Sequence, residues 1–191
     1  RDSEVADYDM GRTRAAGTHR ACDSTLLLLL LVMQGSGMSA SAAAAEERRN
    51  WFDTPFAQAL NGAAYCPPPE GPLITEQQMR ALAHARIERG TSCWLAKKCE
   101  DSNAYKRDPE IQGRVIDALR AEPAFAGSSI WVTTERHWVT LQGCAESARV
   151  RAKLIKEVQR VSGVEEVFDQ MVVGRQKPRW TVDPAWMGRT R

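Results

Sequence analysis

The stretch that decides the fold runs from Ile130 to Val173. Its first part is Ile130-Trp-Val-Thr-Thr-Glu-Arg-His-Trp-Val-Thr-Leu-Gln-Gly143, and its last part is Gly163-Val-Glu-Glu-Val-Phe-Asp-Gln-Met-Val-Val173. Apolar and polar residues alternate in the first part, which is the period of a half-buried strand, and the polar break at 135–137 divides it into two strands. Apolar residues at helical spacing over 148–161 predict a helix that stops at Ser162-Gly163. Residues 167–173 supply a third strand.

A second helix is predicted upstream of this stretch. Asp108-Pro109-Glu110 starts it, with Asp108 as the N-cap and the proline at the first helical position, and Pro123 marks its end. The unit 108–174 therefore has the order helix, strand, strand, helix, strand (αββαβ). A strand–helix–strand crossover favours parallel pairing of the second and third strands. We expect an α+β domain in which a three-stranded mixed sheet packs on two helices.

Two short motifs point to a family. Val139-Thr-Leu-Gln-Gly143 and Gly163-Val-Glu-Glu-Val167, in this order and spacing, resemble the BON domain of bacterial envelope and osmotic-stress proteins. The resemblance implies contact with phospholipid membranes and a non-enzymatic role in envelope integrity or osmotic-stress tolerance. The hairpin tip departs from the family, which commonly has a small or glycine-containing turn where this chain has Arg136-His137-Trp138.

The first 45 residues have the composition of a secretory signal peptide with a few residues upstream of it. Basic residues precede an apolar core that contains Leu26–Leu31, and a small-residue stretch with Ser39-Ala-Ser-Ala42 follows. The core is too short to span a bilayer, so the mature chain is expected to have no transmembrane helix. Residues 1–45 therefore predict export to the periplasm.

An N-terminal extension, 46–107, is expected to add one helix to the domain. Thr75 and Gln78 form a capping-box pattern, and Gly90 closes the predicted helix. The proline-rich stretch 66–72 is predicted to be a stiff extended linker, because proline has no backbone N–H for helix or sheet.

Four cysteines remain after removal of the signal peptide: Cys66, Cys93, Cys99 and Cys144. An even number in an exported protein favours disulfides, and three pairings are open. The short spacing favours Cys93 with Cys99, a staple for the extension, which leaves Cys66 to join Cys144. A structural zinc site is the alternative, but the spacing fits no familiar zinc motif.

The last segment, 175–191, is basic and punctuated by Pro and Gly, and it is predicted to be a flexible tail. Interleaved Arg and Trp residues also suit an interfacial contact with anionic lipid. The candidates for contact with anionic phospholipid or with another envelope protein are Trp94, Trp131, Arg136, Trp138, Arg175, Lys177, Arg179 and Trp180.

The sequence contains no arrangement typical of an enzyme, and neither a cofactor nor a metal is expected. It has no phosphate-binding Gly-rich loop, no nucleophile elbow and no His-Glu-x-x-His pair. A formal net charge of +2 is too small to indicate nucleic acid, and the Gly-x-x-Gly clamp of KH-like domains is absent. Two functions remain: a membrane-associated envelope protein, or a module that docks another envelope component through the Trp94 loop and Trp51-Phe52.

Overall fold

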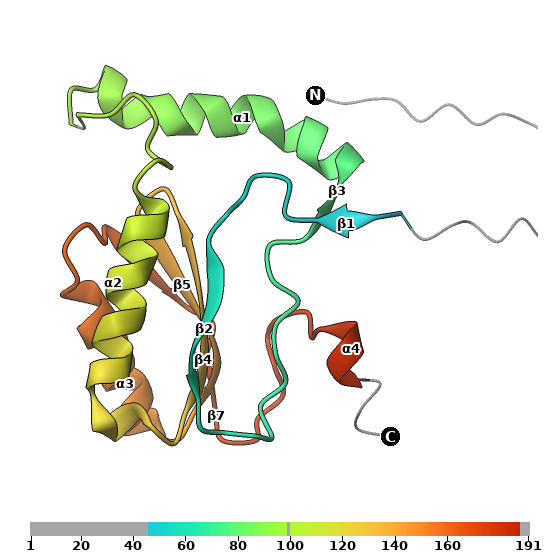
Figure 1. Cartoon of the computed structure of the whole chain (residues 1–191), viewed down its shortest axis with the longest axis vertical. Helices are drawn as coiled ribbons and strands as arrows, with labels where there is room; N and C mark the ends of the chain where they lie inside the picture. Colours follow the sequence, from blue (N-terminus) through green and yellow to red (C-terminus); the bar gives the residue numbers. More distant parts are fainter. Residues whose placement is uncertain (1–45, 99, 188–191) are drawn as a thin grey trace, which may run out of the picture. The chain divides into compact units, whose positions relative to one another are not determined.

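The computed structural model describes residues 46–98 and 100–187. The predicted signal peptide and Cys99 lie outside the described residues. The elements, in chain order, are β1 (Arg48–Arg49), β2 (Phe56–Asn61), β3 (Ile74–Thr75), α1 (Glu76–Leu95), α2 (Asp108–Ala121), the 3-10 helix η1 (Pro123–Phe125), β4 (Ser129–Glu135), β5 (Trp138–Ala145), α3 (Ala148–Gln159), β6 (Glu166–Asp169), β7 (Val172–Val173) and α4 (Pro184–Met187) (Figure 1).

The main sheet has the strand order β2-β4-β5-β6, and β7 also pairs with β5. β4 and β5 form an antiparallel hairpin, and β6 and β7 both run parallel to β5 after the crossover through α3. The mixed α+β architecture and the parallel crossover were both predicted. The predicted third strand is divided in two between β6 and β7, where the Met171 N–H donates to the Asp169 side chain while the Gln170 N–H still donates to Leu141 of β5.

The prediction of a three-stranded sheet is wrong, because β2 adds an edge strand antiparallel to β4. Its sequence, Phe-Ala-Gln-Ala-Leu-Asn, contains no β-branched residue, so its strand propensity is low. The register also shifts between Gln58 and Leu60, which breaks the alternation that identifies a strand. Pairing with the exposed edge of β4, rather than local preference, makes this segment a strand.

α2 and α3 lie on one face of the sheet and bury the main core against it (Figure 1). β4 and β5 contribute alternate residues to this core, as their alternating pattern predicted. Gly143 lets the two strands approach, since a Cβ at this position would lie 2.1 Å from the Ser129 carbonyl oxygen and its φ is +131°. The fully buried large side chains are Ile111, Val115, Leu119, Phe125, Ile130, Val132, Thr134, Val139, Leu141, Leu154, Val158 and Met171.

A disulfide joins Cys66 to Cys144, which lies near the C-terminal end of β5 on the sheet face opposite α2 and α3. This confirms the favoured pairing. The sulfur atoms lie in a second apolar cluster with Trp131 and Trp180. The bond closes a separation of 78 residues and ties the proline-rich segment to β5. The Cys93–Cys99 pairing stays a prediction, since Cys99 is outside the described residues.

The C-terminal segment differs from the predicted flexible tail. Residues 180–183 run antiparallel to the proline-rich segment 67–70, and Pro69 bridges to Val182. The Trp180 indole N–H donates to the Pro67 carbonyl at 3.2 Å, and the ring is buried. Prolines cannot donate backbone hydrogen bonds, so they are paired here through their carbonyl oxygens.

α1 begins with the predicted capping box, in which Thr75 and Gln78 exchange hydrogen bonds. It does not end at Gly90 as predicted, but continues to Leu95. Gly90 is instead the contact point with the ring of Tyr105, where a Cβ would lie 2.7 Å from the ring. The glycine marks close packing and not a helix end.

Candidate functional site

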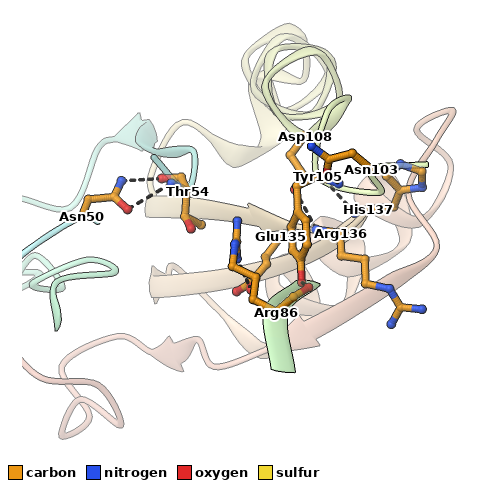
Figure 2. A network of polar contacts seen from close by, with 9 residues as sticks. All are labelled: Asn50, Thr54, Arg86, Asn103, Tyr105, Asp108, Glu135, Arg136 and His137. Atoms are coloured by element: carbon orange, nitrogen blue, oxygen red, sulfur yellow. Dashed lines mark hydrogen bonds and ion pairs between the residues drawn. The ribbon is translucent and has the colours of Figure 1, made fainter. Parts of the chain in front are cut away.

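The β4–β5 hairpin turns through two residues in the left-handed region, Arg136 at φ 56° and His137 at φ 65°. Two-residue turns of this kind normally use Asn or Gly, because other side chains cost about 1–2 kcal/mol per residue there. Asp108 offsets this cost: its carboxylate accepts the backbone N–H of Arg136 at 2.7 Å and of His137 at 2.8 Å (Figure 2). Arg107 takes the N-cap position predicted for Asp108, which frees the aspartate to hold the turn.

The Asp108 carboxyl group is buried beneath the hairpin turn. Burial raises its pKa above the ordinary value of 3.8, because the charged form loses solvent. The hydrogen bonds from the hairpin and the nearby charges of His137 and Arg86 oppose this shift without cancelling it. Ionising the carboxyl group that holds the turn therefore costs more free energy than ionising an exposed aspartate.

Arg86 fastens α1 to the hairpin. Its guanidinium forms an ion pair with Glu135 at 2.6 Å and lies 3.7 Å from the centroid of the Tyr105 ring (Figure 2). The same guanidinium lies 4.6 Å from the centroid of the Phe52 ring. The Tyr105 hydroxyl in turn donates to the Arg86 carbonyl oxygen at 3.2 Å. These contacts of Arg86 hold the C-terminal half of α1 against the hairpin.

An exposed aromatic pair lies on the sheet face opposite α2 and α3. The rings of Trp138 and Phe168 meet edge to face, with centroids 5.6 Å apart, and their side chains are 36% and 42% exposed. The Arg136 guanidinium lies 4.9 Å from the Trp138 ring. Arg89 of α1 lines the same hollow, which has a volume of about 320 Å³. We call Arg89, Arg136, Trp138 and Phe168 the aromatic–arginine surface.

The charges around this hollow favour an anion. Glu135 is its only acidic lining residue within the described part of the chain, and its carboxylate is already paired with Arg86. Arg89 makes no ion pair among the described residues, and the buried Nε of Arg136 has no hydrogen-bond partner there. Two arginines that have no acidic partner among the described residues, beside two exposed rings, can bind a phosphate group while the rings contact apolar material.

Of the predicted contact residues, Arg136 and Trp138 lie in the aromatic–arginine surface. Trp131 and Trp180 are buried together beside the disulfide, each 8% exposed, so neither presents its ring to a partner. Trp131 alternates onto the outer sheet face as expected, but the C-terminal segment covers that part of the face.

The remaining predicted contact residues are exposed and lie apart from the aromatic–arginine surface. Arg175 lies over the Tyr65 ring at 4.5 Å. Lys177 and Arg179 are exposed in the C-terminal segment and make no ion pair within the described residues. Trp94 is 47% exposed near the end of α1, next to Leu95.

Sequence reasoning missed Phe168 and Arg89. Phe168 could have been found, because it alternates with Val167 and therefore points away from the core, and it pairs in register with Thr140. No local sequence pattern identifies Arg89, because its position depends on the contacts by which Arg86 joins α1 to the hairpin.

The described residues contain no group of three or more His, Cys, Asp or Glu side chains that could hold a metal ion. The His137 ring pairs with the Glu165 carboxylate at 3.1 Å, and the His137 backbone N–H donates to the Asp108 carboxylate.

Comparison with known families identifies the central unit. Residues 107–175 match the family model of the BON domain. This confirms the resemblance inferred from the two short motifs, and the matched region runs from the residue before α2 to just beyond β7. The BON family is generally non-catalytic and is associated with phospholipid binding and the cell envelope. The comparison with curated proteins gave no match.

The aromatic–arginine surface is only partly within the BON match. Arg136, Trp138 and Phe168 belong to it, whereas Arg89 comes from the extension that precedes it. As for the membrane itself, none of the helices in the described ranges combines the length and the apolar character that a crossing requires.

Proposed function

We propose that this chain is a non-enzymatic periplasmic protein that contacts anionic phospholipid membranes through the aromatic–arginine surface and supports envelope integrity or osmotic-stress tolerance. One observation carries the proposal: Trp138 and Phe168 form an exposed pair beside two arginines on the sheet face opposite α2 and α3. The BON match supports the lipid class, and the composition of residues 1–45 supports export.

The expected binding mode is peripheral. Trp prefers the headgroup region of a bilayer, and each basic residue near an anionic surface adds about 1 kcal/mol. Arg89 and Arg136 together would add about 2 kcal/mol, which corresponds to roughly 30-fold in affinity. Binding should therefore require anionic lipid and weaken with salt.

Co-sedimentation with phosphatidylglycerol-containing and purely phosphatidylcholine vesicles tests this proposal. The wild-type chain should sediment only with the anionic vesicles, and Arg89→Gln/Arg136→Gln should bind them roughly 30-fold more weakly. Lys153→Gln/Lys156→Gln removes the same charge from α3 and serves as the control. Equal binding to both vesicle types would reject the proposal, as would equal losses in the two double variants.

The alternative is a protein-interaction module of the envelope. It is favoured by four large exposed apolar side chains on α1: Ile87 and Leu95 are 67% and 68% exposed, Trp94 is 47% exposed and Leu82 is 41% exposed. Trp51 and Phe52 support it less than expected, since the Trp51 indole donates to the Ile74 carbonyl and Phe52 stacks on Arg86. Under this alternative, Trp94→Ala should remove a specific envelope protein from pull-downs and leave vesicle binding unchanged.

A further inference from the structure

α3 carries a row of cations that neither the BON match nor the proposed membrane contact explains. Arg149, Lys153, Lys156 and Arg160 follow one another at spacings of four, three and four residues, so they lie along one side of the helix. All four are exposed. At 1.5 Å per residue, the row is about 16 Å long.

The row is largely unneutralised. Arg149, Lys153 and Lys156 make no ion pair or side-chain hydrogen bond within the described residues, and only Arg160 has an acidic partner, Glu157, at 3.3 Å. The arginines of neighbouring α2 differ: Arg114 pairs with Glu110, and Arg120 donates to the backbone of β2. Like charges at these spacings destabilise a helix by a few tenths of a kcal/mol per pair, so the row has a cost that its own fold does not offset.

The shape of the row distinguishes between two kinds of anionic partner. Its exposed neighbours on α3 are Ala148, Ala152 and Gln159, with no aromatic or long apolar side chain to enter a bilayer. A shallow hollow of about 280 Å³ lies beside it and is lined by Glu122, Phe125, Lys153, Lys156, Glu157 and Arg160. A narrow, straight and purely polar row fits a flexible chain of anionic groups better than a lipid surface.

We infer that the α3 row is a binding site for a water-soluble linear polyanion that carries closely spaced phosphate groups. The row lies on the helix side of the domain, and the aromatic–arginine surface lies on the opposite sheet face. A chain with both surfaces can hold an acidic polymer while it contacts a membrane. Binding is electrostatic, with each phosphate displacing counterions from the row.

Titration with inorganic polyphosphate at several salt concentrations tests the inference on the intact chain. Four contacts predict a slope of log K against log salt of about −3, and Lys153→Gln/Lys156→Gln should halve that slope and weaken binding at least tenfold. Lys97→Gln/Lys98→Gln removes the same charge from the end of α1 and should leave both quantities within twofold. Thermal melting should be unchanged in both variants, because all four lysines are exposed.

Three outcomes would overturn the inference. The wild-type chain could fail to bind polyphosphate. The two double variants could lose affinity equally, in which case only net charge matters. Lys153→Gln/Lys156→Gln could instead lose binding to anionic vesicles and keep polyphosphate binding, in which case the row serves a membrane. The first two outcomes leave the proposed function untouched, because it depends on Arg89→Gln/Arg136→Gln in the vesicle assay. The third outcome would also count against the proposed function if the vesicle binding of the two double variants fell equally.

Discussion

The carboxylate of Asp108, in the first turn of α2, accepts the backbone N–H of Arg136 at 2.7 Å, and through this bond a helix N-terminus fixes the tip of the β4–β5 hairpin. The second oxygen accepts the N–H of His137 at 2.8 Å. Because Arg136 also contributes its guanidinium to the aromatic–arginine surface, the buried aspartate positions a side chain that the proposed membrane contact uses.

Replacing Asp108 should therefore destabilise the domain. Asp108→Ala leaves two backbone N–H groups without a partner, and we expect the free energy of unfolding to fall by about 2–3 kcal/mol in urea titrations. The double change Arg136→Asn/His137→Gly supplies residues suited to positive φ and should raise stability by about 1–2 kcal/mol in the wild-type background. An unfolding free energy for Asp108→Ala within error of the wild-type value would contradict the role of Asp108 in holding the turn.

Asp108 should make the free energy of unfolding fall as pH rises, which is the reverse of the usual effect of an aspartate. Its folded-state pKa is raised above 3.8, so the folded chain binds more protons than the unfolded chain in the window above 3.8. The stability that this raised pKa contributes is fully present below pH 3.8 and is lost as pH rises through the folded-state pKa. The unfolding free energy of wild type minus that of Asp108→Asn should therefore fall, towards negative values, as pH rises from 3 towards neutrality.

Glu110 is the matched control for this titration. A hydrogen bond from Arg114 lowers the pKa of this exposed carboxyl below 4.5, so its contribution is present above 4.5 and is lost as pH falls. The wild-type minus Glu110→Gln difference should change with pH in the opposite direction. Differences with the same sign for both variants would contradict the assignment of opposite pKa shifts.

Two helical glycines should respond in opposite ways to the same change. Gly90→Ala in α1 places a Cβ 2.7 Å from the Tyr105 ring, and we expect a loss of about 1–3 kcal/mol from the strain. Gly113→Ala in α2 meets no atom within 4 Å, so it should stabilise by up to about 1 kcal/mol through helix propensity. Thermal melts of both variants measure the contrast, and stabilisation of both would show that α1 does not pack on Tyr105 in this way.

The disulfide should be a major source of stability. Cys66→Ala/Cys144→Ala opens a separation of 78 residues, and the chain-entropy model gives about 4–5 kcal/mol for a loop of that size. The loss should appear as a lower midpoint of unfolding in guanidinium chloride, together with a red shift of tryptophan fluorescence as Trp180 becomes exposed. A midpoint within error of wild type would mean that the apolar cluster around Trp131 holds the proline-rich segment without the bond.

Much of the central domain was predictable because its information is local. The alternation in β4 and β5, the helical spacing in α3 and the stop after it define the elements, and the single long crossover favours only one pairing direction. The Cys66–Cys144 bond was the pairing that the short spacing of Cys93 and Cys99 favoured, although the sequence left three pairings open.

The remainder depends on contacts between distant segments. β2 becomes a strand only because β4 offers an unpaired edge, and the C-terminal segment is ordered only because it pairs with the proline carbonyls. The proposed site shows the same limit. In the sequence, nothing separates Trp131 and Trp180 from Trp138. Only the folded chain shows that Trp131 and Trp180 are buried together while Trp138 stays exposed.

The central claim is that the aromatic pair enters the membrane interface, and co-sedimentation of Trp138→Ala/Phe168→Ala with phosphatidylglycerol-containing vesicles tests it most directly. Both side chains are partly exposed, so the variant should remain folded by circular dichroism. Loss of about 1–2 kcal/mol of apolar burial predicts roughly tenfold weaker binding. A folded variant that binds anionic vesicles as tightly as the wild-type chain would contradict the account.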